Sequence, residues 1–158
     1  MHRKTVGHIS RIFTAKGLSL SAAESCTGGL ICHLLTTVPG ASRFFRAGVV
    51  AYSAAAKKSI LGIGQKVFSA YGMVSGETAR HMAEKMLLLT KTDIAVSTTG
   101  NLGPAVLEGK PKGLVYMAVS TRSGTVIRKY LFTGTRGQIK EKAAHAALAL
   151  IAEVVGND

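Results

Sequence analysis

The chain has 158 residues, a length that predicts one globular domain, residues 1–158, with a core of its own. Its composition of 47% hydrophobic and 18% charged residues excludes an intrinsically disordered protein. The net charge of +12 predicts an anionic partner, which could be a small phosphorylated molecule, a nucleic acid or a membrane surface.

Several absences narrow these classes. No apolar run reaches the roughly 18 residues of a membrane span, so we expect no membrane partner. The basic N-terminal segment contains Arg11 and Lys16 where a signal peptide would be apolar, and Gly17 favours a first helix over an organelle transit peptide, so we expect a cytoplasmic protein. Cys26 and Cys32 form no C-x-x-C pair, which predicts neither a disulfide nor a metal site. The basic residues are scattered without aromatic interleaving, which disfavours nucleic acid as the partner.

Hydrophobic periodicity predicts the secondary structure in chain order. Apolar residues at helical spacing, ended by Gly17, predict a first helix over 2–16. The further helices are expected over 27–38, 54–62, 67–71 and 77–90, the last capped by Ser75, and in a final segment after 135. Strands are expected at 18–23, 47–53, 93–98, 114–121 and 125–132, the last two as a hairpin.

Two of the helices have well-marked apolar stripes. The stripe of the 77–90 helix contains Ala79, Met82, Ala83, Met86 and Leu89. The buried face expected for the final helix contains Ile139, Ala143, Ala146, Leu150, Ile151 and Val154. Helices that alternate with strands and then give way to a hairpin predict a layered α/β/α single domain with a mixed β-sheet.

Three loops should meet at the carboxyl ends of the strands, where α/β proteins usually bind ligands: 24–29, 52–57 and 99–112. Ser25 lies at a strand end, and the glycines that follow allow close backbone approach, so the amides there could hold an anion or an oxyanion. Ser25 is therefore a candidate nucleophile, with Cys26 as the alternative.

A serine nucleophile needs a base, and the five histidines have no acidic partner at a spacing that predicts a Ser-His-Asp triad. Lys57, in an apolar stretch five residues after Tyr52, could act as the base if burial lowers its pKa; the alternative is a solvated helix lysine. These residues by themselves predict a small-molecule hydrolase or an anion-binding domain.

Several segments, in order along the chain, carry a resemblance to a known family: "AESCTGGLI", "VPGASRFFRAGVVAYSAAAKKSILGI", "YGMVS", "DIAVSTTG", Gly103-Pro104, "KPKGLVYMAV" and "FTGTR". The chain resembles the family of nicotinamide-nucleotide amidase and the C-terminal domain of the competence/damage-inducible protein CinA. That resemblance implies hydrolysis of nicotinamide mononucleotide, a small anionic pyridine mononucleotide, to nicotinate mononucleotide and ammonia, without a metal or other cofactor, by a homodimer.

The resemblance also implies roles for individual residues. The catalytic residues that it implies are Ser25, Tyr52 and Lys57, with Lys57 taking the proton of Ser25 and Tyr52 relaying or orienting it. The substrate-binding residues are Thr27, Gly28, Gly29, Gly100, Gly103 and Arg136, and the amides of 27–29 are expected to hold the oxyanion.

The chain departs from the family pattern at two places. Ala54 replaces an asparagine of the family's "YSNEAK", and Val106 and Leu107 replace a glycine pair of its "GIAGPDGG" loop. These changes leave the substrate open. The alternatives are a catalytically altered or inactive CinA-like nucleotide-binding protein and a small basic nucleic-acid-binding domain.

Overall fold

The computed structural model describes residues 2–156 and contains one five-stranded sheet. Its strands are β1 (Leu20–Glu24), β2 (Phe45–Val50), β3 (Ile94–Gly100), β4 (Leu114–Thr121) and β5 (Gly124–Leu131), in the spatial order β2-β1-β3-β4-β5. β1 pairs in parallel with both β2 and β3, whereas β4 runs antiparallel to β3 and to β5. The sheet is mixed, as the sequence predicts.

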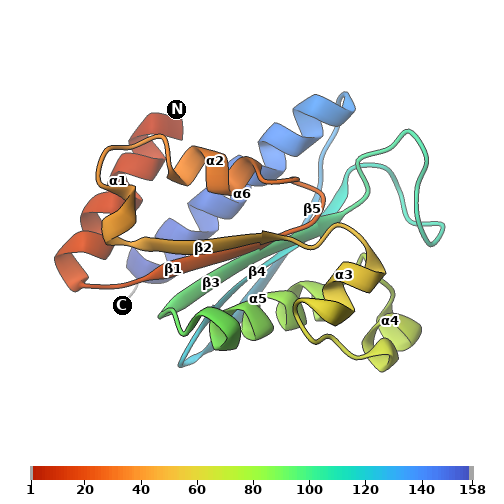
Figure 1. Cartoon of the computed structure of the whole chain (residues 1–158). Coiled ribbons are helices and arrows are strands. Elements are labelled where there is room, and N and C mark those ends of the chain that lie inside the picture. The colour runs from red at the N-terminus through yellow and green to blue at the C-terminus, as the bar shows by residue number, and fades with distance from the viewer. Residues whose placement is uncertain (1, 157–158) are drawn as a thin grey trace.

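Helices cover both faces of this sheet (Figure 1). One face carries α1 (His2–Lys16), α2 (Leu30–Leu35) and α6 (Arg136–Gly156), and the other carries α3 (Ala54–Ser59), α4 (Gln65–Tyr71) and α5 (Gly76–Thr90). A single 3-10 turn, Ala41–Arg43, precedes β2. The layered α/β/α fold predicted from the sequence is therefore confirmed. Among residues 2–156, no helix combines the length and the apolar character needed to cross a bilayer.

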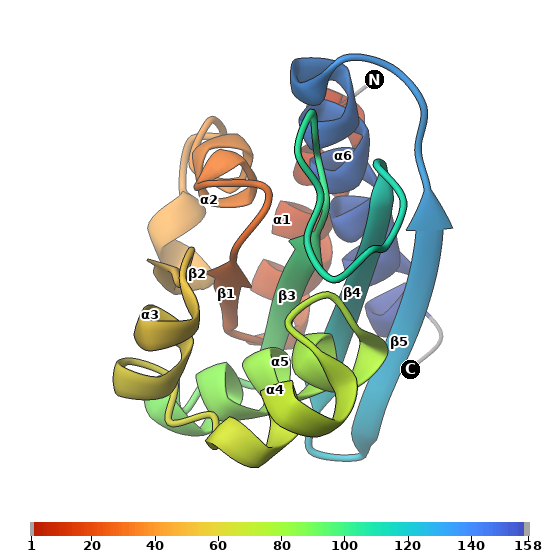
Figure 2. The ribbon, with the colours of Figure 1, turned by 90° about the vertical axis from the view of Figure 1, so that its right-hand side faces the viewer.

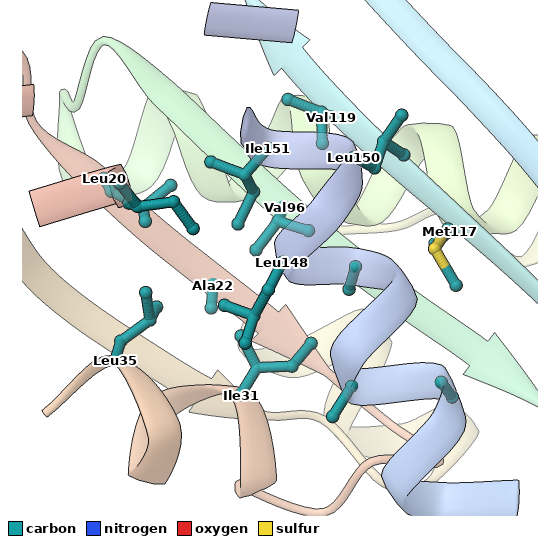
Figure 3. Packing of buried hydrophobic residues seen from close by; sticks show 14 of the residues in the cluster. Leu20, Ala22, Ile31, Leu35, Val96, Met117, Val119, Leu148, Leu150 and Ile151 are labelled. Atoms are coloured by element: carbon teal, nitrogen blue, oxygen red, sulfur yellow. The ribbon is translucent and has the colours of Figure 1, made fainter. Parts of the chain in front are cut away.

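The core lies mainly between the sheet and α1, α2 and α6. Leu20 and Ala22 of β1 point into this layer, whereas Ala23 packs toward α5, because successive strand residues face opposite sides of a sheet. Figure 3 shows Ile31 of α2 and Leu148 of α6 meeting above β1. This packing holds the end of β1, and the residues that follow it, in a defined position.

Element boundaries differ from the prediction at α2. The helix begins at Leu30 rather than at residue 27, because Gly28 and Gly29 adopt φ values of 56° and 95°, outside the range of a right-handed helix. The intervening turn keeps the residues after Ser25 out of helical geometry. The predicted cap of α5 is confirmed, since the Ser75 hydroxyl accepts a hydrogen bond from the amide of Thr78 at 3.1 Å.

Two predicted apolar faces needed correction. Leu89 of α5 is 55% exposed, so the buried stripe of that helix ends at Met86. On α6, Ala146 and Val154 are only partly buried, and the fully buried positions extend instead to Ala144, Ala147, Leu148 and Val155. The helix packs against both the sheet and α1, so its buried face is wider than one stripe.

Candidate active site

Two elements bring a serine and a lysine together at the carboxyl ends of the parallel strands. Ser25 follows the last residue of β1, and Lys57 lies in the first turns of α3. The N-terminus of α3 is set by Ser53, whose hydroxyl accepts a hydrogen bond from the amide of Ala56 at 3.0 Å. Helical side chains point toward the helix N-terminus, so the Lys57 side chain runs back toward the end of β2.

The Lys57 ammonium group is buried beside the Ser25 hydroxyl. Its Nζ donates to Ser25 Oγ at 2.9 Å and to the Ala51 carbonyl oxygen at 2.8 Å. Lys57 is only 2% exposed, and this burial lowers the pKa of the side chain to about 8. Roughly one fifth of Lys57 is therefore neutral at pH 7.4, and this fraction can accept a proton from the serine. The interpretation of Lys57 as a solvated surface lysine is excluded.

A cavity of about 160 Å³ opens onto this pair. All three loops expected to meet at the strand ends contribute to its wall. Of the predicted site residues, the cavity is lined by Ser25, Tyr52, Lys57, Gly100, Gly103 and Arg136. Figure 2 shows the 101–113 loop and the start of α6 at the same end of the sheet.

Tyr52 and Arg136 form the rim of the cavity. Arg136 donates from Nη2 to the Tyr52 hydroxyl at 2.7 Å and from Nη1 to the Gly103 carbonyl at 2.6 Å. Tyr52 is 59% exposed, and its hydroxyl is directed at the guanidinium. The arrangement places one fixed positive charge at the cavity mouth, held to the loops on either side.

Gly100 and Gly103, two of the predicted substrate-binding residues, are required to be glycine for different structural reasons. A Cβ atom at Gly100 would lie 2.7 Å from the Leu114 carbonyl oxygen, because β4 passes directly beside it. Gly103 has a φ of 72°, which disfavours other residues, and its carbonyl is the one bound by Arg136. Both positions let the backbone line the cavity.

Glu24 orders the turn beside the site, a role that the sequence did not predict. Its fully buried carboxylate accepts hydrogen bonds from the amides of Gly29 at 3.0 Å, Ile31 at 3.1 Å and Cys32 at 2.8 Å. A carboxylate is favoured at a helix N-terminus, where free N–H groups converge. The signal in the sequence that could have indicated this role is the position of an acidic residue directly before the Ser-Cys-Thr cluster and close to a predicted helix start. Glu24 thus fixes the turn that leads from Ser25 into α2.

The expected oxyanion amides are largely engaged within this turn. The Gly29 amide binds Glu24, and the Gly28 amide donates to the Ser25 carbonyl at 3.0 Å. Thr27 is buried, with its hydroxyl 2.8 Å from that of Thr98 on β3. Thr27, Gly28 and Gly29 are absent from the cavity wall, so in this conformation they shape the position of Ser25 and do not face a ligand there.

Cys26, the alternative nucleophile, also lines the cavity but is poorly suited to the role. It is buried, and its burial raises the pKa of the thiol to about 12. Near neutral pH the side chain is a thiol and not the reactive thiolate. The geometry and the protonation states therefore favour Ser25.

Within the described part of the chain, the structure contains no group of three or more His, Cys, Asp and Glu side chains arranged to hold a metal ion. The polar groups that line the cavity are hydroxyl, thiol, amine, amide and guanidinium groups. They can transfer protons and bind anions.

Comparisons with known proteins agree with this architecture. Residues 2–155 match the family model of the CinA C-terminal domain. A protein of Caldicellulosiruptor saccharolyticus named as competence-damage inducible is 46% identical over 143 residues, which are 90% of this chain and 35% of that protein. A CinA-like protein of Chloroherpeton thalassium is 42% identical over 153 residues, 94% of this chain and 36% of the relative. The chain thus spans about a third of the length of these curated relatives.

Solved structures show the same fold. The competence/damage-inducible protein CihA of Agrobacterium tumefaciens superposes with a TM-score of 0.93 at 34% identity, over 98% of this chain and 95% of that one. A CinA superfamily protein of Klebsiella pneumoniae gives a TM-score of 0.96 at 28% identity, over 100% and 99% of the two chains. The match to the family model over nearly the whole chain, together with the shared fold, leads to one conclusion: the chain belongs to the CinA C-terminal domain family.

Proposed function

We propose that the chain is an amidohydrolase that removes the amide of nicotinamide mononucleotide, or of a related small anionic carboxamide. One observation carries the proposal: the buried amine of Lys57 lies 2.9 Å from the Ser25 hydroxyl in a cavity open to a ligand. A nucleophile within hydrogen-bond distance of a base whose pKa is near neutral is the arrangement that covalent hydrolysis needs.

In the first half of the reaction, neutral Lys57 takes the proton of Ser25 as Oγ attacks the carboxamide carbon. The resulting tetrahedral intermediate collapses when the C–N bond breaks, and protonated Lys57 gives its proton to the departing nitrogen, which leaves as ammonia. The substrate's acyl group is then esterified to Ser25.

In the second half, Lys57 takes a proton from a water molecule that attacks the ester carbon. The acyl–oxygen bond breaks, Lys57 returns a proton to Ser25 Oγ, and the carboxylic acid product releases its remaining proton to solvent and leaves as the carboxylate. Lys57 is thus base and acid in turn, which suits a pKa close to the working pH. The two halves consume one water and return the enzyme to its starting state.

The rim supports an anionic substrate. The guanidinium of Arg136 carries a permanent charge, and the chain as a whole carries a net charge of +12, so a phosphate monoester is attracted to the protein and can be oriented at the cavity mouth. Tyr52, which is hydrogen-bonded to Arg136, acts in this proposal through the guanidinium.

The test is release of ammonia from nicotinamide mononucleotide by the purified protein, beside Ser25→Ala and Lys57→Ala. We expect turnover by the unmodified protein and a loss of at least a thousandfold in each variant. Absence of turnover with retained ligand binding would favour a nucleotide-binding protein without catalysis. Turnover unchanged in Ser25→Ala would exclude the nucleophile.

A further inference from the structure

The loop that departs from the family pattern is organised by one buried side chain, that of Asn101. The residue is 3% exposed, and its Oδ1 accepts a hydrogen bond from the Leu107 amide at 3.1 Å. Its Nδ2 donates to the carbonyl oxygens of Leu107 at 3.1 Å and Lys110 at 3.2 Å. Both backbone groups of Leu107 are thus held by a single amide side chain.

The outer part of the loop is tied to the segment before α5. The Glu108 carboxylate accepts from the amides of Met73 at 2.6 Å and Val74 at 3.1 Å. Lys110 donates to the Tyr71 carbonyl at 3.2 Å and pairs with Glu108 at 3.3 Å. Because Leu107 lies between these two sets of contacts, its backbone has a defined position over the site.

Leu107 forms part of the wall of the cavity that also contains Ser25 and Lys57. Its neighbour Val106 has a similar exposure, 42% against 49% for Leu107, but is not part of that wall. The other apolar groups of the cavity are Met73, Val74, Leu102 and Ala105. The reactive pair therefore faces a space whose wall is partly apolar, and Leu107 is a half-exposed part of that wall.

The size of the cavity limits what can enter it. Its volume of about 160 Å³ is below the roughly 300–1,000 Å³ of sites that enclose a whole drug-sized ligand. Such a space suits one flat ring with its carboxamide, while a sugar and phosphate remain at the mouth beside Arg136. A half-exposed side chain in the wall contacts the ring and also restricts the groups attached beyond it.

We infer that Leu107 is a specificity-determining residue of this site, which favours a compact carboxamide ligand over a bulky one, and that Asn101 is the positioning residue that holds it there. This inference rests on the proposed function, because it assumes that the cavity takes the ring of a carboxamide. It goes beyond that function by assigning substrate selection to particular residues of the 101–110 loop.

The experiment measures binding of two probes, nicotinamide mononucleotide and nicotinamide adenine dinucleotide, by calorimetry in the Ser25→Ala background, where hydrolysis does not interfere. The probes share the ring and carboxamide and differ in the bulk beyond the first phosphate. Loss of apolar contact in Leu107→Ala should weaken mononucleotide binding about tenfold. Dinucleotide binding should be unchanged or tighter, because the smaller side chain also leaves room for the groups beyond the first phosphate. The ratio of the two affinities should therefore fall. The matched control Val106→Ala should leave the preference as it is.

Asn101→Ala should reduce the ratio of the affinities for mononucleotide and dinucleotide to the same extent as Leu107→Ala. The double variant should reduce it no further, because both changes remove the same contact of Leu107 with the ligand. A merely structural role of Asn101 would lower the midpoint of thermal unfolding without changing the ratio of the two affinities, and so would refute its positioning role. A ratio unaffected by Leu107→Ala, an equal change in Val106→Ala, or no binding of either probe would overturn the inference. Ammonia release by the unmodified protein is measured separately. Failure of the proposed reaction is therefore distinguishable from failure of the proposed role of Leu107.

Discussion

The Nζ atom of Lys57 lies 2.9 Å from the Oγ atom of Ser25, although the two residues are 32 positions apart in the chain. The contact joins the end of β1 to the start of α3, and it is formed where the amine is almost fully removed from water. Because burial disfavours the charged form, the pKa of Lys57 falls to about 8. This relationship determines both the chemistry and the pH behaviour expected of the protein.

The pH dependence of catalysis should report the titration of Lys57. Below pH 8 the amine is mostly protonated and cannot take the serine proton, so kcat/KM should fall about tenfold for each pH unit below that value and level off above it. Ammonia release measured between pH 5.5 and 9.5 tests this. A rate independent of pH between 6 and 8 would rule out Lys57 as the base.

Ser25 and Cys26 should differ sharply in their effect on activity, although both line the cavity. Ser25→Ala removes the nucleophile and should lower kcat by at least a thousandfold. Cys26→Ser should retain most of the activity, since the pKa of this thiol is raised to about 12 and no thiolate is available near neutral pH. The reverse ranking in the same ammonia assay would assign the reaction to the cysteine.

The burial of Lys57 should also appear in stability. In the unfolded chain its pKa is about 10.5 and in the folded protein about 8, so the folded state is penalised as pH falls from 10.5 to 8, and the penalty is constant below 8. Lys57→Met removes the penalty. Its free energy of unfolding relative to the unmodified protein should therefore be greater at pH 7 than at pH 10, by about 2 to 3 kcal/mol.

Urea unfolding at the two pH values measures this difference. Lys58→Met is the matched control, because Lys58 is the adjacent residue of α3 and is exposed. It should show no comparable change between pH 7 and pH 10. An equal pH effect in both variants would mean that Lys57 is not specifically penalised.

Glu24→Gln should destabilise the fold by about 2 kcal/mol, because hydrogen bonds to a charged group are stronger than those to a neutral amide. The carboxylate accepts three backbone hydrogen bonds at the start of α2, and a glutamine can reproduce only part of this set. Urea unfolding is the measurement. Glu141→Gln, on the exposed side of α6, should change the free energy of unfolding by less than about 0.5 kcal/mol.

Arg136→Gln should affect ligands according to their charge. Loss of the guanidinium should raise KM for nicotinamide mononucleotide about tenfold or more and change KM for nicotinamide riboside, which lacks the phosphate, much less. Arg122→Gln, on an arginine whose side chain is 87% exposed and which is not part of the cavity wall, is the control for net charge. Equal effects on the two ligands would place the phosphate elsewhere.

Much of this site could be predicted from local patterns. Ser25 follows a short apolar strand and precedes two glycines, and Lys57 lies in an apolar stretch after another strand. Strand ends and turn residues therefore indicated both as candidate site residues. The pKa of Lys57 could not be read in this way, because an alanine-rich helix can equally place its lysine in solvent. Burial against Ser25 and the Ala51 carbonyl decided between the two interpretations.

The sequence by itself determined the layered α/β/α class, the mixed sheet and the cap of α5, since hydrophobic period, turn residues and capping residues act over a few neighbouring positions. Only the tertiary structure decided that the Glu24 carboxylate accepts hydrogen bonds from the amides at the start of α2 and that the Asn101 side chain binds the backbone of Leu107. It also turned the Tyr52 hydroxyl toward Arg136, 84 residues away. These outcomes depend on which polar groups become buried together. Packing of the sheet against its two helical layers decides this, whereas the neighbours of each residue in the sequence do not.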